Sequence, residues 1–252
     1  MPDVVLGIFA HPDDAEFLCA GTLLRLAQEW GWQVHIASMT PGDCGSAELA
    51  PEEISRVRRA EGARAAALAG GRYHCLEERD LLVTYNERTL ERATRLLREV
   101  RPQMVLTHSA ADYLVDHEMT SLVVRATTFA APVPNFLRDR GHGPALDRIP
   151  HLYYCDAIEG RDVLGRDVEP AFFVDISAVI EDKSAMLACH ASQREWLLKH
   201  HGMDQYLQAM RDWSAHRGKA AGVAFAEGFR QHLGHSYPRE NLLERLLASG
   251  GR

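Results

Sequence analysis

The chain begins with a continuous apolar run, Val4–Ala10, which contains β-branched residues. Such a run is typical of a strand buried on both faces, and strands of that kind form parallel sheets covered by helices. The run leads directly into His11-Pro12-Asp13-Asp14. The N-terminus therefore predicts a helix-covered sheet with ionisable side chains at the end of its first strand.

Strand and helix signals then alternate. Helices are predicted over residues 17–30, from Pro51 to the glycines at 70–71, and from about Arg88 to Val100. Strands are predicted at Val34–Met39, Tyr73–Leu76 and Gln103–His108. This order predicts the α/β class, with a doubly wound, mostly parallel sheet and right-handed crossovers.

The C-terminal half continues the same domain. A proline-rich loop follows residue 130, then strands are expected at Leu152–Cys155 and Ala171–Ile176, with helices from there to the end. Because no repeat, low-complexity tract or linker interrupts the chain, we expect residues 1–252 to form a single domain with a helical C-terminal elaboration.

Composition excludes several classes of function. The net charge is −7 and no block of five or more like charges occurs, which argues against nucleic acid as a partner. Apolar runs are far shorter than the roughly 20 residues of a membrane-spanning helix, so we expect a soluble, cytoplasmic protein with no membrane partner. The five cysteines have neither disulfide nor Cys-x-x-Cys spacing. The dinucleotide, phosphate-loop and nucleophile-elbow motifs are absent.

Two polar clusters follow predicted strands. His11, Asp13 and Asp14 follow the first strand, and Asp116-His117 lies after the strand that ends at His108. Because ligands gather beyond the carboxyl ends of parallel strands, we expect the clusters to meet. Two imidazoles and a carboxylate suit a hydrolytic zinc site, and a remaining carboxylate can act as the base. The alternative is that Asp13 and Asp14 cap the next helix.

The same residues carry a resemblance to a known family. The motifs are Ala10-His11-Pro12-Asp13-Asp14-Ala15-Glu16-Phe17, then Ala20-Gly21-Thr22-Leu23, and Thr107-His108 through Asp112-Tyr113 to Asp116-His117. They resemble the PIG-L (LmbE-like) family of zinc-dependent N-deacetylases. A weaker match extends over most of the chain, including Arg58-Arg59-Ala60-Glu61 and Glu227-Gly228-Phe229-Arg230.

The resemblance implies a Rossmann-like fold, a Zn²⁺ cofactor or another divalent metal, and removal of an N-acetyl group from an amino-sugar conjugate of the N-acetylglucosaminyl type. It further implies that His11, Asp14 and His117 are the metal ligands and that Asp13 is the general base for a metal-activated water. Arg58 matches an arginine that helps to bind the acyl group. Its alternative role is a surface ion pair with Glu61 or Glu53. A homo-oligomer is also expected from the resemblance alone.

One position departs from the family pattern. The family commonly has a histidine where this chain has Leu114, and that histidine helps to stabilise the oxyanion. We expect His108 or Tyr113 to supply the missing donor, with Asp116 orienting the imidazole; alternatively, the metal alone carries the oxyanion. A third possibility is a metal-binding protein with weak or lost hydrolase activity. Loop histidines His142, His200 and His201 are further candidates for the cleft.

Overall fold

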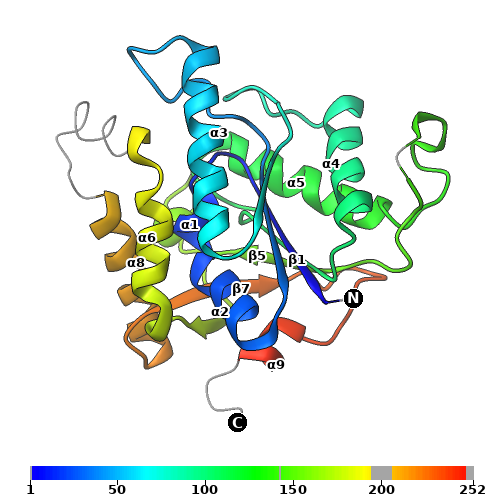
Figure 1. The fold of residues 1–252 in the computed structure, drawn as a ribbon. Helices are drawn as coiled ribbons and strands as arrows, with labels where there is room; N and C mark the ends of the chain where they lie inside the picture. Colours follow the sequence, from blue (N-terminus) through cyan, green and yellow to red (C-terminus); the bar gives the residue numbers. More distant parts are fainter. Residues whose placement is uncertain (1, 142, 194–205, 248–252) are drawn as a thin grey trace.

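Seven strands form one central sheet, in the order β3-β2-β1-β4-β5-β7-β6 (Figure 1). The computed structural model describes residues 2–141, 143–193 and 206–247. The strands are β1 (Val4–Phe9), β2 (Gln33–Ser38), β3 (Arg72–Cys75), β4 (Met104–Thr107), β5 (His151–Cys155), β6 (Phe172–Asp175) and β7 (Ala226–Gln231). Strands β1 to β5 pair in parallel, and β7 is antiparallel to both of its neighbours.

Helices cover both faces of this sheet. They are α1 (Asp14–Leu18), α2 (Ala20–Trp30), α3 (Pro51–Leu68), α4 (Glu87–Val100), α5 (Val115–Ala130), α6 (Ile180–Ala188), α8 (Tyr206–Ala221) and α9 (Leu242–Leu247). Helices α4 and α5 pack on one face, whereas α2, α3, α6, α8 and α9 contribute to the apolar cluster on the other. The doubly wound α/β prediction is therefore confirmed.

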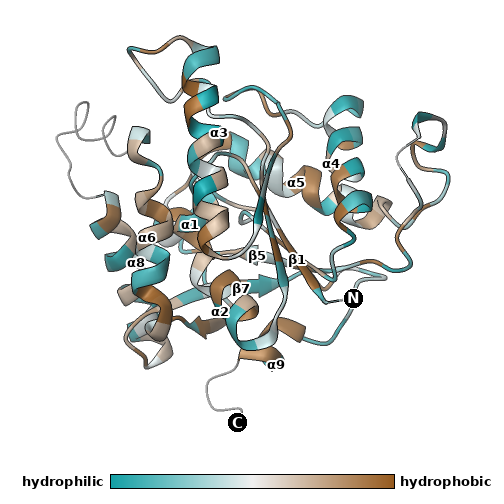
Figure 2. Ribbon diagram, viewed as in Figure 1, coloured by the Kyte–Doolittle hydropathy of each residue, from teal (hydrophilic) through white to brown (hydrophobic). Residues whose placement is uncertain are grey.

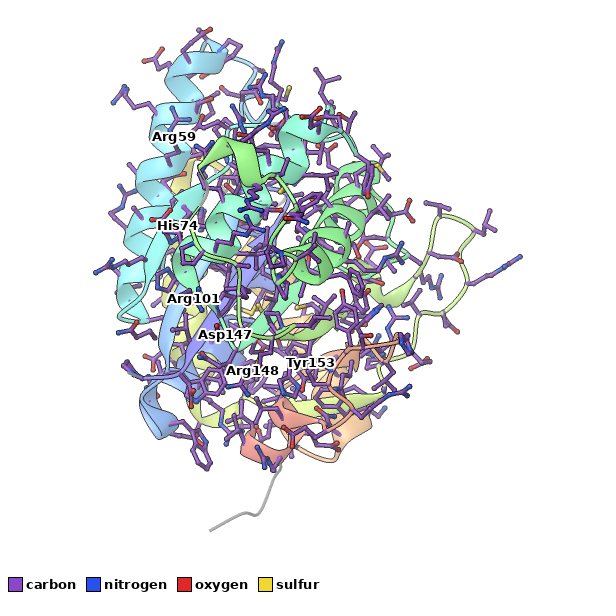
Figure 3. All side chains as sticks on the ribbon, turned by 90° about the vertical axis from the view of Figure 1, so that its right-hand side faces the viewer. Arg59, His74, Arg101, Asp147, Arg148 and Tyr153 are labelled. Carbon is purple, nitrogen blue, oxygen red and sulfur yellow. The ribbon has the colours of Figure 1, made fainter. Side chains whose placement is uncertain are left out.

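Alternation along β1 explains the two cores. Val5 belongs to the cluster beneath α2 and α6, whereas Leu6 belongs to the cluster beneath α4 and α5, and both side chains are fully buried. Figure 2 shows β1 as a hydrophobic strand at the centre of the fold, with hydrophilic surfaces on the outer helices. In the side view of Figure 3, Tyr153 of β5 lies in this interior, and its side chain is fully buried.

The first helix is interrupted where a single helix from residue 17 to 30 was expected. Helix α1 ends at Leu18, Cys19 has non-helical backbone angles, and α2 begins at Ala20. Glu227 of β7 accepts the N–H groups of Gly21 and Thr22, at 2.9 and 2.8 Å. This buried carboxylate satisfies two otherwise unpaired donors at the start of α2, which allows the chain to restart a helix there.

The expectation of helices alone after residue 176 was wrong, because β7 follows α8. The sequence of β7 lacks the usual pattern of a strand. Glu227 lies within the strand but is buried and paired with Lys183 Nζ at 2.7 Å. Gly228 is also unusual in a strand, and a Cβ there would lie 2.6 Å from Pro170 Cγ. A buried charge and a glycine remove the period-two pattern by which strands are identified.

None of the described helices is both long and apolar enough to cross a membrane. The single-domain organisation, the cytoplasmic location and the homo-oligomeric state stay predictions.

Candidate metal centre and active site

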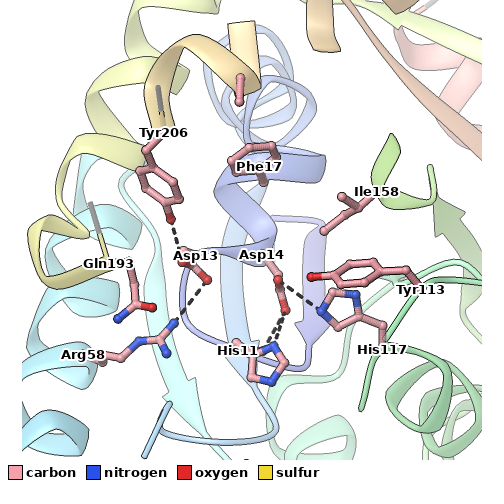
Figure 4. A pocket seen from close by; sticks show the side chains of 11 residues that line it. His11, Asp13, Asp14, Phe17, Arg58, Tyr113, His117, Ile158, Gln193 and Tyr206 are labelled. Atoms are coloured by element: carbon pink, nitrogen blue, oxygen red, sulfur yellow. Dashed lines mark hydrogen bonds and ion pairs between the residues drawn. The ribbon is translucent and has the colours of Figure 1, made fainter. Parts of the chain in front are cut away.

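A cavity of about 340 Å³ opens at the carboxyl ends of β1 and β4 (Figure 4). The residues that line it are His11, Asp13, Asp14, Phe17, Arg58, Tyr113, His117, Ile158, Gln193, Tyr206 and Ala209. They come from the turn after β1, from α1, α3, α5 and α8, and from the segments at 113, 158 and 193. The folded chain thus brings both polar clusters of the sequence to one cavity, as parallel-sheet geometry predicts.

His11, Asp14 and His117 form a compact set of potential metal ligands. One ligand atom from each lies within 4.8 Å of the others. His11 Nδ1 lies 3.4 Å from Asp14 Oδ2, and His117 Nε2 lies 3.6 Å from Asp14 Oδ1. Two imidazoles and one carboxylate, with space on the cavity side, are a donor set that zinc accepts in hydrolytic sites. The residues present therefore fit the metal that the resemblance implies.

Buried carboxylates orient both imidazoles from behind. His117 Nδ1 donates to Asp112 Oδ1 at 2.9 Å, which leaves Nε2 free to face Asp14. His11 Nε2 lies 3.4 Å from Asp116 Oδ2, so that its Nδ1 faces Asp14. Carboxylates in this outer position fix the tautomer of a ligating histidine and raise its basicity.

The electrostatics of this set favour a cation. Burial alone would lower the pKa of His11, but the carboxylates of Asp116 and Asp14 outweigh it and raise the pKa to about 10. Burial would raise the pKa of Asp14, yet the imidazoles of His117 and His108 hold it well below its ordinary value. The cluster therefore retains proton or metal charge near neutral pH.

A second set, His108, Asp112 and His117, also has ligand atoms within 4.8 Å of one another. His108 is fully buried, its ring stacks on that of His117 at 3.9 Å, and its Nε2 accepts the N–H of Ala10 at 2.9 Å. Burial, reinforced by His117, lowers the pKa of His108 to about 4, despite the opposing charge of Asp14. Since His108 and Asp112 do not line the cavity, we take the first set as the candidate metal centre.

Asp13 faces the same cavity with a different set of partners. Its backbone has φ of 107°, a strained value for a residue that is not glycine. Its side chain makes no capping bond to α1; instead it accepts from Tyr206 OH at 2.6 Å and from Arg58 Nη2 at 3.3 Å. Burial and the negative charge of Asp14 raise the pKa of Asp13, despite the opposing charge of Arg58.

Arg58 is held in a cradle of backbone. It is 4% exposed, and its Nη2 donates to the carbonyl oxygen of Pro12 at 2.6 Å. A Cβ at Gly42 would lie 2.3 Å from Arg58 Nη1, and one at Gly45 would lie 2.6 Å from the same atom. Only glycines can approach the guanidinium this closely. The interpretation of Arg58 as a surface arginine is therefore wrong.

Comparison with known proteins indicates a family for the N-terminal part of the chain. The model of the PIG-L family, described as GlcNAc-PI de-N-acetylase, matches residues 6–128, which span the β1 turn, Arg58 and the start of α5. This part of the chain, just under half of its length, is similar to the PIG-L family.

Similar proteins include enzymes of two reaction types. The diacetylchitobiose deacetylase of Thermococcus kodakarensis is 28% identical over 239 residues, covering 90% of this chain and 82% of that protein. The solved N,N'-diacetylchitobiose deacetylase of Pyrococcus horikoshii has a TM-score of 0.77 and 25% identity, covering 95% of this chain and 88% of that one. The 4-oxalmesaconate hydratase of Pseudomonas putida is 25% identical over 236 residues, covering 89% of this chain and 87% of that protein.

The PIG-L motif residues divide into those at the cavity and those behind it. Tyr113 lines the cavity, with its ring edge-on to His117 at 5.5 Å, whereas His108 and Asp116 lie behind the ligand set. Asp116 contacts His11 and accepts the N–H of Leu81 at 2.6 Å. Leu114 precedes α5 and does not line the cavity. Of the two expected oxyanion donors, Tyr113 is the one at the cavity wall.

Three of the histidines suggested for the cleft, His142, His200 and His201, lie outside the described residues.

Sequence reasoning missed Tyr206 and Gln193. Both line the cavity, yet they lie far along the chain from the PIG-L motifs. Tyr206 contacts Asp13, and Gln193 Nε2 donates to the carbonyl oxygen of Gly45 at 3.1 Å. A tyrosine and a glutamine in predicted helices carry no spacing signal, so only the packing of α6 and α8 beside α1 reveals them.

Proposed function

We propose that this protein is a zinc-dependent hydrolase that removes the N-acetyl group from an amino-sugar substrate of the N-acetylglucosaminyl type. The observation that carries the proposal is the position of Asp13, which faces the same cavity as the His11, Asp14 and His117 donor set. The similarity to deacetylases from Thermococcus kodakarensis and Pyrococcus horikoshii supports the reaction class.

The cavity offers residues for a metal and a separate residue for a general base. His11, Asp14 and His117 would hold the ion, which when bound lowers the pKa of a water molecule and polarises the amide carbonyl. The carboxylate of Asp13 is bonded to Tyr206 and Arg58 and is separate from the three metal ligands. A carboxylate with a raised pKa beside the cavity is suited to accept the proton of the attacking water.

Asp13 then serves a second time. Once protonated, it can return the proton to the amine nitrogen as the C–N bond breaks, which releases acetate and the free amino sugar. The Tyr206 and Arg58 hydrogen bonds keep the carboxylate in place for both transfers. The backbone of Asp13 has a strained φ of 107°, and its side chain does not cap α1.

The rest of the cavity suits an acetamide on a sugar ring. Arg58 offers a fixed guanidinium to the acyl oxygen or to the acetate product. Tyr113 places a phenol group on the opposite wall, and burial raises its pKa, so that it remains a neutral hydrogen-bond donor. Phe17 and Tyr113 add aromatic surface against which a sugar ring can pack.

The proposal is tested with a panel of N-acetylglucosamine, N,N'-diacetylchitobiose and larger N-acetylglucosaminyl conjugates. We expect zinc-loaded protein to release free amine and acetate in equal amounts, and we expect chelator-treated protein to regain the activity when zinc is added back. If the zinc-loaded protein leaves every N-acetyl group intact, the proposal is wrong.

A second candidate is a hydratase, because a relative covering a comparable share of this chain is a 4-oxalmesaconate hydratase. The same metal set, base and Arg58 would suit the addition of water to the double bond of an unsaturated carboxylic acid. Loss of the double-bond absorbance of such acids, without acetate release from the sugar panel, would favour this reaction.

A further inference from the structure

Two loops meet beside the metal centre and bring together a thiol and two carboxylates. Asp43 and Cys44 belong to the loop after β2, and Asp80 belongs to the loop after β3. One ligand atom from each of the three residues lies within 4.8 Å of the others. All five cysteines are free thiols, and Cys44 is the exposed one.

The two loops are fixed to each other by their backbones. Cys44 N–H donates to Asp80 Oδ2 at 3.0 Å, and Asp80 N–H donates to Asp43 Oδ1 at 2.8 Å. These bonds use one oxygen of each carboxylate. The remaining oxygens and the Cys44 sulfur are therefore held near one another by the fold and do not depend on chance side-chain positions.

The carboxylate of Asp80 is only partly satisfied by hydrogen bonds. Its side chain is 7% exposed, and its Oδ1 is buried without a hydrogen-bond partner among the described residues. A buried carboxylate oxygen without a partner is costly, so such an atom indicates a bound water or cation. The positively charged side chain of Arg79 is 71% exposed, and its Nε lies 3.4 Å from Asp43 Oδ2.

Negative charge around Asp80 also favours a bound cation. Burial and the negative charges of Asp43, Asp80 and Asp116 raise the pKa of the Cys44 thiol. The charge of Asp80 also contributes to the raised pKa of His11. Excess negative charge thus extends from the metal centre into these two loops.

We propose that Asp43, Cys44 and Asp80 form a second divalent-cation site, separate from the His11, Asp14 and His117 set, and that it takes a thiolate-binding ion such as Zn²⁺. The sulfur ligand selects Zn²⁺ over Mg²⁺ or Ca²⁺, which prefer oxygen ligands alone. This inference goes beyond the proposed function and does not depend on it.

The loop that carries Asp43 and Cys44 also contacts Arg58, which lines the substrate cavity. Asp43 and Cys44 lie between Gly42 and Gly45, the two glycines that pack on the Arg58 guanidinium. A cation joining this loop to Asp80 would fix the cradle of Arg58. Binding at the second site would therefore stabilise the position of Arg58.

The first test counts bound zinc after equilibrium dialysis of the full chain. We expect two ions in the wild-type protein and one in each of Cys44→Ser, Asp80→Asn and His117→Ala. Matched controls are Cys189→Ser, which changes a thiol elsewhere, and Asp147→Asn, a surface carboxylate paired with Arg101 (Figure 3). Both controls should keep two ions.

The second test reads the thiol directly in the wild-type protein. Alkylation of Cys44 is followed by peptide mass spectrometry with and without Zn²⁺. At a free Zn²⁺ concentration of ten times the Kd, about one thiol in eleven is free, so alkylation should slow about tenfold, and Mg²⁺ should have no effect. In His117→Ala, Co²⁺ should give a thiolate charge-transfer band that is absent when Cys44→Ser is added.

The outcomes separate the two zinc sites. A single ion in the wild-type protein, or a second ion that persists in both Cys44→Ser and Asp80→Asn, overturns the second site. Undiminished alkylation of Cys44 in excess Zn²⁺ overturns it as well, and needs no variant to fold. Retention of both ions in His117→Ala would instead contradict the assignment of the first site.

Discussion

The hydrogen bond from Tyr206 to Asp13 gives the sharpest mutational prediction. In Tyr206→Phe the ring and its contact with Phe17 remain, and the hydroxyl that donates to Asp13 Oδ2 at 2.6 Å is lost. A hydrogen bond to a charged group contributes about 1.5–3 kcal/mol. Because one pKa unit corresponds to about 1.36 kcal/mol, the pKa of Asp13 should rise by about one to two units.

The sign of the pH effect follows from the role of Asp13 as a base. Asp13 must be deprotonated to accept a proton, so a higher pKa moves the acidic limb of the kcat/KM profile to higher pH. The profile is measured for acetate release with zinc-loaded protein. Tyr237→Phe is the matched control, because its hydroxyl bonds to the carbonyl oxygen of Arg125 at 2.8 Å, away from the cavity. An unchanged acidic limb in Tyr206→Phe would refute this account of Asp13.

Three further variants test other parts of the site. Asp112→Ala should weaken zinc binding about 10- to 100-fold in equilibrium dialysis, because His117 loses the carboxylate that orients it; unchanged affinity would mean that Asp112 does not support a ligand. Gly45→Ala should lower kcat/KM by up to about 100-fold by displacing Arg58, and normal kinetics would show that the cradle is unnecessary. Tyr113→Phe should reduce kcat about 100- to 1000-fold with little change in KM, and a full kcat would exclude it as the oxyanion donor.

The parallel half of the fold was predictable because its signals are local. Apolar strands with both faces buried and amphipathic helices ended by glycine or proline leave clear patterns, as Val4–Ala10 and the stop at Gly31 illustrate. Strand β7 was not predictable, since Glu227 is buried in it by a tertiary ion pair with Lys183. A charge that is neutralised by a distant residue looks, in sequence, like a surface residue.

The candidate site was predictable to the extent that its residues lie at strand ends. His11, Asp14 and His117 could be brought together by the rule that parallel strands share one edge, and the structure places them in one cavity. The rule gives no side-chain orientation. It therefore could not place His108 behind the site or bring Tyr206 to Asp13 from the far end of the chain.

The most direct test of the central claim pairs metal content with turnover in Asp13→Asn. The substitution keeps the shape of the side chain and leaves His11, Asp14 and His117 intact, so zinc should be retained at the wild-type stoichiometry. Acetate release from the best N-acetylglucosaminyl substrate should fall about 100- to 10,000-fold, the contribution expected of a general base. Wild-type turnover in a zinc-loaded Asp13→Asn protein would contradict the account.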